Sequence, residues 1–139
     1  MHQSRLLLLA LLLPLVACTA GSDRSPYATT KAPASTVDVR LASFTVTASV
    51  SSIAAGSIKF AATNTSTTEV HELAVLRVRT DGSLENTGEV EDIGPGKSGA
   101  VVLALPAGKY ELACLIAKGE AGSAVDHYQA GMHIPFEVR

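Results

Sequence analysis

Alternation of apolar and polar residues is the feature that most constrains how this chain can fold. Val37, Val39 and Leu41 are separated by polar residues, and the same period of two returns at residues 58–62 and 134–138. Successive side chains of a β-strand point to opposite faces, so this period predicts strands with one buried face. No part of the sequence after residue 35 has a helical period. The alternation therefore predicts an all-β domain.

Turn sequences rich in glycine and proline separate the expected strands. Thr80-Asp81-Gly82-Ser83 ends a strand predicted over residues 71–79, and Pro106-Ala107-Gly108-Lys109 is expected to form a hairpin into the next strand. Between Leu41 and Phe44 the alternation changes phase, which predicts a β-bulge or a strand that crosses between sheets. The spacing of the turns is typical of a Greek-key β-sandwich.

Residues 1–17 are expected to export the chain. A basic start, Met1 to Arg5, precedes an apolar run from Leu6 to Val16, which is too short to span a bilayer and suits a secretory signal. The run ends in Leu15-Val16-Ala17-Cys18, which resembles a bacterial lipoprotein signal, in which the cysteine receives lipid and becomes the new N-terminus. The alternative is an ordinary signal peptide that is cleaved near Ala20.

The remaining sequence divides into a tether and one domain. Residues 18–35, which begin with the lipidated cysteine, are rich in Thr, Ser, Ala, Pro and Gly and predict a flexible tether. Residues 36–139 are enough for one hydrophobic core. No later segment is long and apolar enough to span a membrane. We therefore expect a protein of the cell envelope, held by its lipid alone at the periplasmic or extracytoplasmic face of a bacterial membrane.

The charge balance argues against nucleic acid as a partner. The chain has 11 Lys and Arg residues against 13 Asp and Glu residues, with a formal net charge of −2. The basic residues form no stripe, whereas binding to a phosphate backbone needs clustered positive charge.

Sulfur is scarce in this chain, which gives the few sulfur-containing residues special weight. Apart from Cys18 the single cysteine is Cys114, and apart from Met1 the single methionine is Met132. With Cys18 lipidated, Cys114 has no disulfide partner. A lone thiol in an oxidising envelope is expected to be buried or bound to a metal.

Two histidines complete a set of candidate metal ligands. His71 and His127 stand with the two sulfur residues in the order His-x42-Cys-x12-His-x4-Met. Two histidines and a cysteine with a weak axial methionine are the ligands of electron-transfer copper sites. Strand parity points Cys114 and Met132 inward, whereas His133 has the opposite parity and is expected at the surface. The alternative is a buried core cysteine beside histidines that bind no metal.

These residues resemble those of the cupredoxins, the blue copper proteins that include plastocyanin, azurin and the sulfocyanin-like group. The resemblance covers residues 37–138 and rests on these segments: Asn64, His71-Glu72-Leu73, Gly108-Lys109-Tyr110, Cys114, His127-Tyr128, Gly131-Met132 and Phe136-Glu137-Val138. It implies one type 1 copper ion held by His71, Cys114 and His127, with Met132 as the weak axial ligand. It also implies single-electron transfer, with the edge of His127 as the exit for the electron.

The chain departs from the family pattern in two places. Many members have only two to four residues between the cysteine and the next histidine, whereas the segment from Ala117 to Asp126 makes this loop much longer. The loop either bulges outward without moving His127 or leaves that histidine loosely held. Glu72 stands where plastocyanin and azurin have Asn, and its side chain either points outward or lies near the metal.

Three functions from different classes follow. The leading hypothesis is a membrane-tethered type 1 copper protein that transfers single electrons between redox protein partners. The second is a copper-binding or copper-delivery lipoprotein, against which the shortage of methionines counts. The third is a metal-free β-sandwich that serves as an interaction module. None of them is an enzyme, because a type 1 site has no open coordination position and the Asp126-His127 pair is not a hydrolytic triad.

Overall fold

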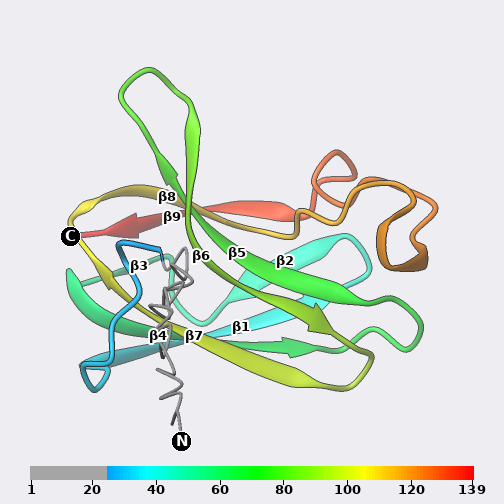
Figure 1. Cartoon of the computed structure of the whole chain (residues 1–139), viewed down its shortest axis with the longest axis horizontal. Coiled ribbons are helices and arrows are strands. Elements are labelled where there is room, and N and C mark those ends of the chain that lie inside the picture. Colours follow the sequence, from blue (N-terminus) through cyan, green and yellow to red (C-terminus); the bar gives the residue numbers. More distant parts are fainter. Residues whose placement is uncertain (1–24) are drawn as a thin grey trace, which may run out of the picture.

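The described part of the chain forms two β-sheets that pack face to face (Figure 1). The structure is a computed structural model that describes residues 25–139, so the expected signal peptide, Cys18 and residues 19–24 lie outside the described residues. Within residues 25–139, the regular elements are strands and one three-residue 3-10 helix, η1 (Glu120–Gly122). The predicted all-β sandwich is confirmed. No helix of the described part is long and apolar enough to cross a membrane.

One sheet has four strands and the other has five. The four-stranded sheet has the order β2-β1-β4-β7 and is formed by β2 (Thr45–Ala48), β1 (Ser35–Ala42), β4 (Gly56–Asn64) and β7 (Ser98–Leu105). The five-stranded sheet has the order β3-β9-β8-β5-β6 and is formed by β3 (Ser52–Ile53), β9 (His133–Val138), β8 (Gly108–Ala113), β5 (His71–Val78) and β6 (Leu84–Ile93). Two pairs are parallel, β1 with β4 and β3 with β9.

The hydrophobic core lies between the two sheets, where alternate residues of each strand point inward. Phe60 of β4 packs edge-on against Phe136 of β9, with ring centroids 5.8 Å apart, and so joins the sheets. β5 is the exception to the alternation, because four successive residues, 73–76, are buried. Its inner face contacts the core, and its outer face lies under Leu115 and Tyr128. The strand predicted over residues 71–79 is therefore present as β5, which lies between β8 and β6 in its sheet.

Two predicted connections differ from the structure. The phase change near Phe44 is a tight hairpin in which Ala42 pairs with Thr45, so neither a bulge nor a crossing is present there. Phe44 has a φ of 56° in this turn. The link at Pro106-Ala107 passes from β7 in one sheet to β8 in the other, so the predicted hairpin is wrong. A two-residue link is compatible with a hairpin in one sheet and with a crossing between the two sheets. The strands that pair with β7 and β8 determine which of the two forms.

The described part of the expected tether is packed against the domain. Tyr27 contacts the hydrophobic core, and its carbonyl oxygen accepts the N–H of Ala104 at 2.8 Å. Farther along, the N–H of Ala34 donates to the carbonyl of Ser57 at 2.8 Å. Residues 25–34 therefore differ from the flexible tether predicted for this stretch, because Ala28 forms a bridge with Leu103 of β7 and the ring of Tyr27 is partly buried against the core.

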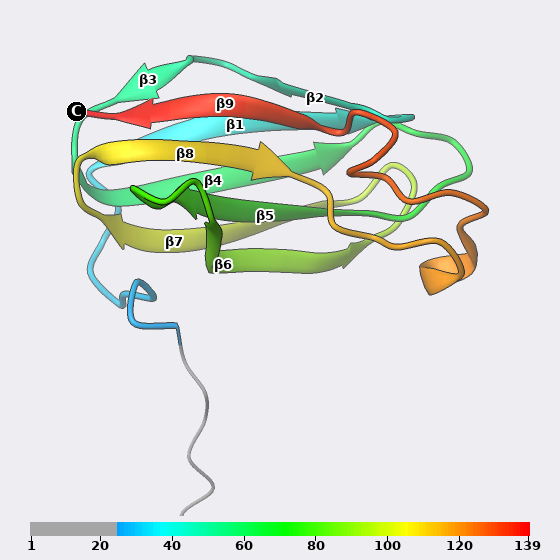
Figure 2. The same ribbon diagram turned by 90° about the horizontal axis from the view of Figure 1, so that it is seen from above.

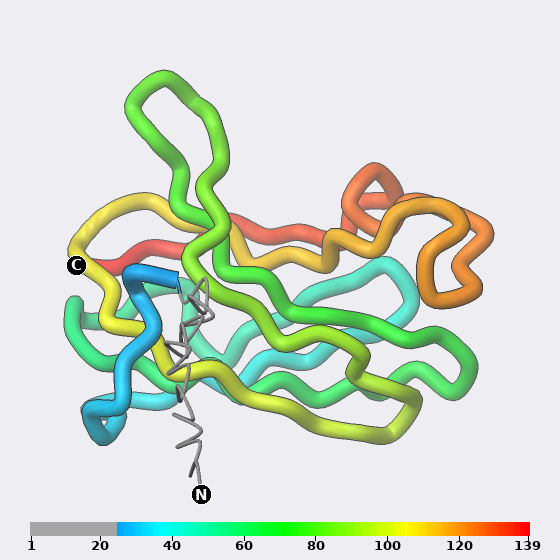
Figure 3. The backbone as a smooth tube through the Cα atoms, in the orientation of Figure 1, coloured from blue at the N-terminus to red at the C-terminus, as the bar shows by residue number. Residues whose placement is uncertain are grey.

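The long loop between β8 and β9 covers one end of the sandwich (Figure 3). The turns that join β1 to β2, β4 to β5 and β6 to β7 lie at the same end (Figure 2). The C-terminus lies at the opposite end (Figure 2). Residues from several parts of the sequence therefore meet at the loop-covered end.

Candidate metal centre

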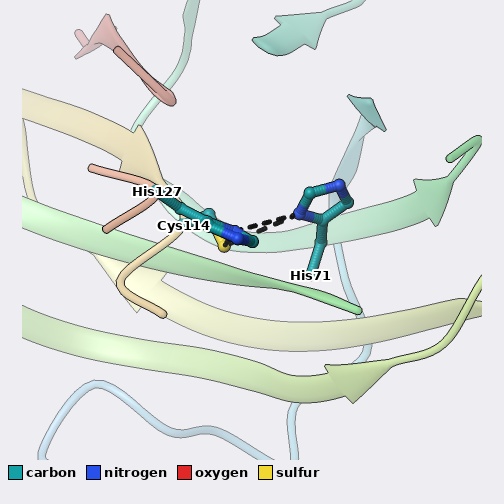
Figure 4. A group of neighbouring side chains, drawn as sticks. All are labelled: His71, Cys114 and His127. Atoms are coloured by element: carbon teal, nitrogen blue, oxygen red, sulfur yellow. Dashed lines mark hydrogen bonds between the residues drawn. The ribbon is translucent and has the colours of Figure 1, made fainter. Parts of the chain in front are cut away.

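Three donor side chains converge at the loop-covered end (Figure 4). His127 Nδ1 lies 3.2 Å from His71 Nδ1 and 3.3 Å from Cys114 Sγ, and the third separation, between Cys114 Sγ and His71 Nδ1, is 4.0 Å. All three side chains have 0% exposure. The structure thus brings together three of the four predicted ligands, which we call the His-Cys-His cluster.

Strand pairing explains how His71 and Cys114 meet. β5 and β8 are antiparallel, with Ala74 opposite Ala113, so the start of β5 lies beside the end of β8. His71 is the first residue of β5 and Cys114 directly follows β8. Because side chains alternate along a strand, His71 and Cys114 point inward from neighbouring strands. The inward direction predicted for Cys114 is confirmed, and His71 has the same direction.

Asn64 anchors the loop that leads to His71. Its side-chain amide donates to the carbonyls of Glu69, at 2.8 Å, and Ile93, at 2.7 Å, and its Oδ1 accepts the N–H of Ser66 at 2.9 Å. Asn64 has 0% exposure, so these bonds satisfy a buried amide. The start of β5 is thereby attached to β4 and to the end of β6.

His127 is held firmly although it lies in a long loop. Its N–H donates to the carbonyl of Ile116 at 2.9 Å, and its carbonyl accepts the N–H of Met132 at 3.0 Å. The ring of Phe44 packs edge-on against the imidazole, with centroids 5.3 Å apart, and Ser123 Oγ lies 2.9 Å from Nε2. The loop therefore covers His127, and the edge that the family resemblance implied as the electron exit is buried.

Met132 lies beside the His-Cys-His cluster. Its carbonyl accepts the N–H of Cys114 at 3.0 Å, and its own N–H bonds to His127. The side chain has 0% exposure and belongs to the same core cluster as Cys114. The inward direction predicted for Met132 is confirmed.

Glu72 approaches the cluster through its main chain, whereas its side chain has the parity of Ala74 and Leu76 on the outer face of β5. Its N–H donates to Cys114 Sγ at 3.4 Å, and its Oε1 accepts the N–H of Leu115 at 2.9 Å. Burial raises the pKa of the Glu72 carboxyl, and the bond from Leu115 opposes that rise. Of the two alternatives that the sequence left open, the structure supports the outward one, with the carboxylate held against Leu115 rather than among the three donor atoms.

Burial favours the neutral form of each of the three side chains in the cluster. Burial raises the pKa of the Cys114 thiol, although the N–H groups of Glu72 and Ile116 act in the opposite direction. Burial also lowers the pKa of both imidazoles, those of His71 and His127. A bound dication reverses this balance, because it stabilises the thiolate and takes the lone pairs of neutral imidazoles.

The donor set fits a soft metal ion. The Nδ1 atoms of His71 and His127 face each other, and two lone pairs in that position repel unless a proton or a cation lies between them. His71 Nε2 is a buried nitrogen without a hydrogen-bond partner among the described residues. A cation among the three inward donor atoms would fix Nδ1 as the ligand of each ring, with sulfur as the third donor.

His133 lies outside the cluster, as its parity predicted. Its ring stacks on Tyr128 with centroids 4.3 Å apart, and its Nδ1 lies 3.7 Å from a carboxylate oxygen of Glu111. The side chain is 39% exposed. It is therefore a suitable control position for metal binding.

Two residues that contact His127 were not predicted from the sequence. Phe44 was noted only where the alternation changes phase, and nothing local shows that a turn directs its ring to a histidine 83 positions later. Ser123 lies in a small and polar segment after Gly122, where a serine is ordinary. Both contacts depend on tertiary packing, and the single local signal is the glycine content of the loop.

Comparison with known proteins establishes the fold class. No family model and no curated protein matches the sequence. Among solved structures, reduced auracyanin from the photosynthetic bacterium Roseiflexus castenholzii matches with a TM-score of 0.58 and 18% identity over 78% of this chain and 99% of its own. Auracyanin B matches with a TM-score of 0.57 and 20% identity over 83% of this chain and 96% of its own. The two sheets and their order define a cupredoxin-like β-sandwich, and the chain has the fold of the auracyanins.

A part of a larger protein shows the same fold. The copper-containing nitrite reductase of Thermus scotoductus SA-01 matches with a TM-score of 0.51 and 12% identity over 78% of this chain, but over only 32% of its own length. At these identities the matches establish the architecture alone.

Proposed function

We propose that this protein binds one copper ion in a type 1 site and transfers single electrons between redox protein partners. The observation that carries the proposal is the convergence of Cys114 Sγ with the Nδ1 atoms of His71 and His127, at a place where all three side chains are fully buried. The donor set agrees with that of electron-transfer copper sites. Two comparisons support the same conclusion. The chain shares its fold with the auracyanins, and the matching nitrite reductase is described as containing copper.

Each residue of the site has a distinct role in this proposal. Cys114 as thiolate, together with His71 and His127, would hold the copper, and Met132 would be the weak axial ligand. The ion supplies a one-electron couple, Cu(II) and Cu(I). The protein holds the inward nitrogen and sulfur donors in place and excludes water from them, since backbone hydrogen bonds fix Cys114, His127 and Met132. Ligands that are fixed in this way move little when an electron arrives, which suits a carrier.

The proposed protein is a carrier and not an enzyme. The auracyanins match over 99% and 96% of their length, whereas the nitrite reductase matches over 32%. This supports a small carrier over a copper-containing enzyme. We further propose that the lipid on Cys18 tethers it in the bacterial cell envelope, and the sequence Leu15-Val16-Ala17-Cys18 supports that location.

Addition of Cu(II) to the purified full chain tests the copper site. We expect one bound ion per chain and an intense visible absorption from thiolate-to-copper charge transfer. Cys114→Ser abolishes that absorption, and His133→Ala, which changes an exposed imidazole outside the cluster, leaves it intact. A weak and colourless site would instead support copper delivery. Absence of stoichiometric binding would overturn both copper functions and leave the metal-free interaction module.

A further inference from the structure

The hydroxyl group of Ser123 lies within hydrogen-bond distance of three atoms. It donates its one proton to the carbonyl of Val125 at 2.8 Å, and it accepts the N–H of Val125 at 3.2 Å. Its remaining neighbour is Nε2 of His127 at 2.9 Å. A hydroxyl has one donor and two acceptor sites. With that proton directed at the Val125 carbonyl, the contact to His127 is a hydrogen bond when Nε2 carries the hydrogen.

This assignment fixes the tautomer of His127. A neutral imidazole has one N–H, so a hydrogen on Nε2 leaves a lone pair on Nδ1. Nδ1 is the atom that faces Cys114 Sγ at 3.3 Å and His71 Nδ1 at 3.2 Å. We propose that Ser123 is a positioning residue that holds His127 as the Nε2–H tautomer, with the Nδ1 lone pair directed at the metal position before any metal arrives.

The loop is built in a way that presents Ser123. The carbonyl of Ser123 accepts the N–H of Gly119 at 2.8 Å, and its N–H donates to the carbonyl of Glu120 at 2.7 Å. The side chain of Glu120 closes the same turn by accepting the N–H of Ala117 at 2.8 Å. Ala121 has a φ of 46°, a conformation that L residues rarely adopt. A strained residue within a closed hydrogen-bonded turn indicates that the turn is held in one shape.

The ring of Phe44 completes the support of His127. It contacts the imidazole edge-on at a centroid distance of 5.3 Å, at an interplanar angle of 77°. Phe44 also lies in the left-handed region, with a φ of 56°. Phe44 packs against the ring of His127 and fixes the position of that ring. Ser123 contacts Nε2 of the same ring and fixes its tautomer. The extra length of the loop, relative to many cupredoxins, thus supplies a support for the ligand.

The role of Ser123 in metal binding rests on the proposed copper function, whereas the tautomer is a property of the metal-free protein. The first experiment is therefore two-bond ¹⁵N–¹H correlation spectroscopy of the metal-free full chain at about pH 8, above the ordinary pKa of imidazole. We expect His127 as the Nε2–H tautomer in the wild type and in Ser123→Thr. In Ser123→Ala we expect a mixture of tautomers, because the Nε2 acceptor is lost.

The second experiment measures Cu(II) affinity of the same variants by competition with a chelator. Ser123→Ala is expected to weaken binding about tenfold, as the loss of a partner to a ligating histidine commonly does. Ser123→Thr restores the affinity, and Ser83→Ala, which removes an exposed hydroxyl in a distant hairpin, leaves it unchanged. Wild-type His127 as the Nδ1–H tautomer overturns the proposal, and so does Ser123→Ala with unchanged tautomer and affinity. If the tautomer is as stated but no copper binds, the proposed function fails and the role of Ser123 toward copper fails with it.

Discussion

The main-chain N–H of Glu72 is directed at Cys114 Sγ, 3.4 Å away. The carboxylate of the same residue accepts the N–H of Leu115 at 2.9 Å, so Glu72 contacts the thiol and the residue that follows it. An N–H that is directed at sulfur stabilises the thiolate over the thiol. Glu72 therefore links the start of β5 to the segment that leaves β8 and supports the charged form of the proposed ligand.

Replacement of Glu72 tests how much this link contributes. Glu72→Ala leaves the N–H of Leu115 unpaired in a partly buried place, and we expect the free energy of unfolding of the metal-free chain to fall by about 1–2 kcal/mol. Glu72→Gln keeps a side-chain oxygen and should retain most of the stability. Denaturant unfolding measures both, with the exposed Glu91→Ala as the control. Equal losses in the Ala and Gln variants would contradict the role of the oxygen.

Met132→Leu tests the proposed axial ligand. Leucine fills a similar volume in the buried position but offers no lone pair, so the variant should keep its copper. Loss of a weak axial donor destabilises Cu(II) relative to Cu(I), and the reduction potential is therefore expected to rise. Redox titration of the copper-loaded chain measures the potential, and Ile116→Leu is a control in the same core. Complete loss of copper in Met132→Leu would show that the axial assignment is wrong.

Gly99 marks a close approach between the two sheets. A Cβ at Gly99 of β7 would lie 2.4 Å from Cγ1 of Val90 in β6, whereas one at Gly94 would lie 3.7 Å from the Lys97 side chain. Gly99→Ala forces the valine or its strand to shift and should lower the free energy of unfolding by about 1–3 kcal/mol. Gly94→Ala is the matched control, because its added Cβ would make only an ordinary van der Waals contact with Lys97. Similar unfolding midpoints for the two variants would mean that the sheets can separate there without cost.

The buried phenol of Tyr110 is expected to make the free energy of unfolding fall in alkaline solution. Its phenol donates to the carbonyl of Pro106 at 2.8 Å, and burial raises its pKa above the ordinary value of 10.0, although Arg77 opposes the rise. The folded chain thus retains a proton that the unfolded chain releases. Above about pH 10 the free energy of unfolding therefore falls as pH rises toward the folded pKa.

The comparison with Tyr110→Phe isolates this effect. The variant lacks the hydrogen bond and should be less stable than the wild type at pH 7 by about 1 kcal/mol. It also lacks the ionisable group, so the advantage of the wild type should shrink above about pH 10. Chemical unfolding of both proteins at neutral and alkaline pH measures the difference, and an advantage that stays constant with pH would contradict the prediction.

The direction of the strand side chains was predictable because it depends on local alternation. Cys114 follows the inward column of Tyr110 and Leu112, and His71 shares its parity with Leu73, so both could be placed without knowledge of the sheets. A strand with an apolar face shows its period in the sequence. Those parts of the candidate site that lie on strands were therefore predicted correctly.

Features that depend on long-range contacts were not predictable in this way. β6 was missed because it is an edge strand with a largely polar sequence, LENTGEVEDI. Its buried Thr87 is satisfied by a bond to the carbonyl of Val75 at 2.7 Å, which no local pattern reveals. His127 lies in a polar loop, and its burial depends on Phe44 and Ser123, which approach it only in the folded chain.

Complete burial of the three donor side chains has a kinetic consequence. With 0% exposure at His71, Cys114 and His127, an ion or a chelator reaches the donor atoms only when the covering loop opens. Binding and release of the ion then depend on the same opening of the loop between β8 and β9. Once a chelator captures the ion faster than the loop closes, the rate of removal no longer increases with chelator concentration and equals the opening rate of the loop itself.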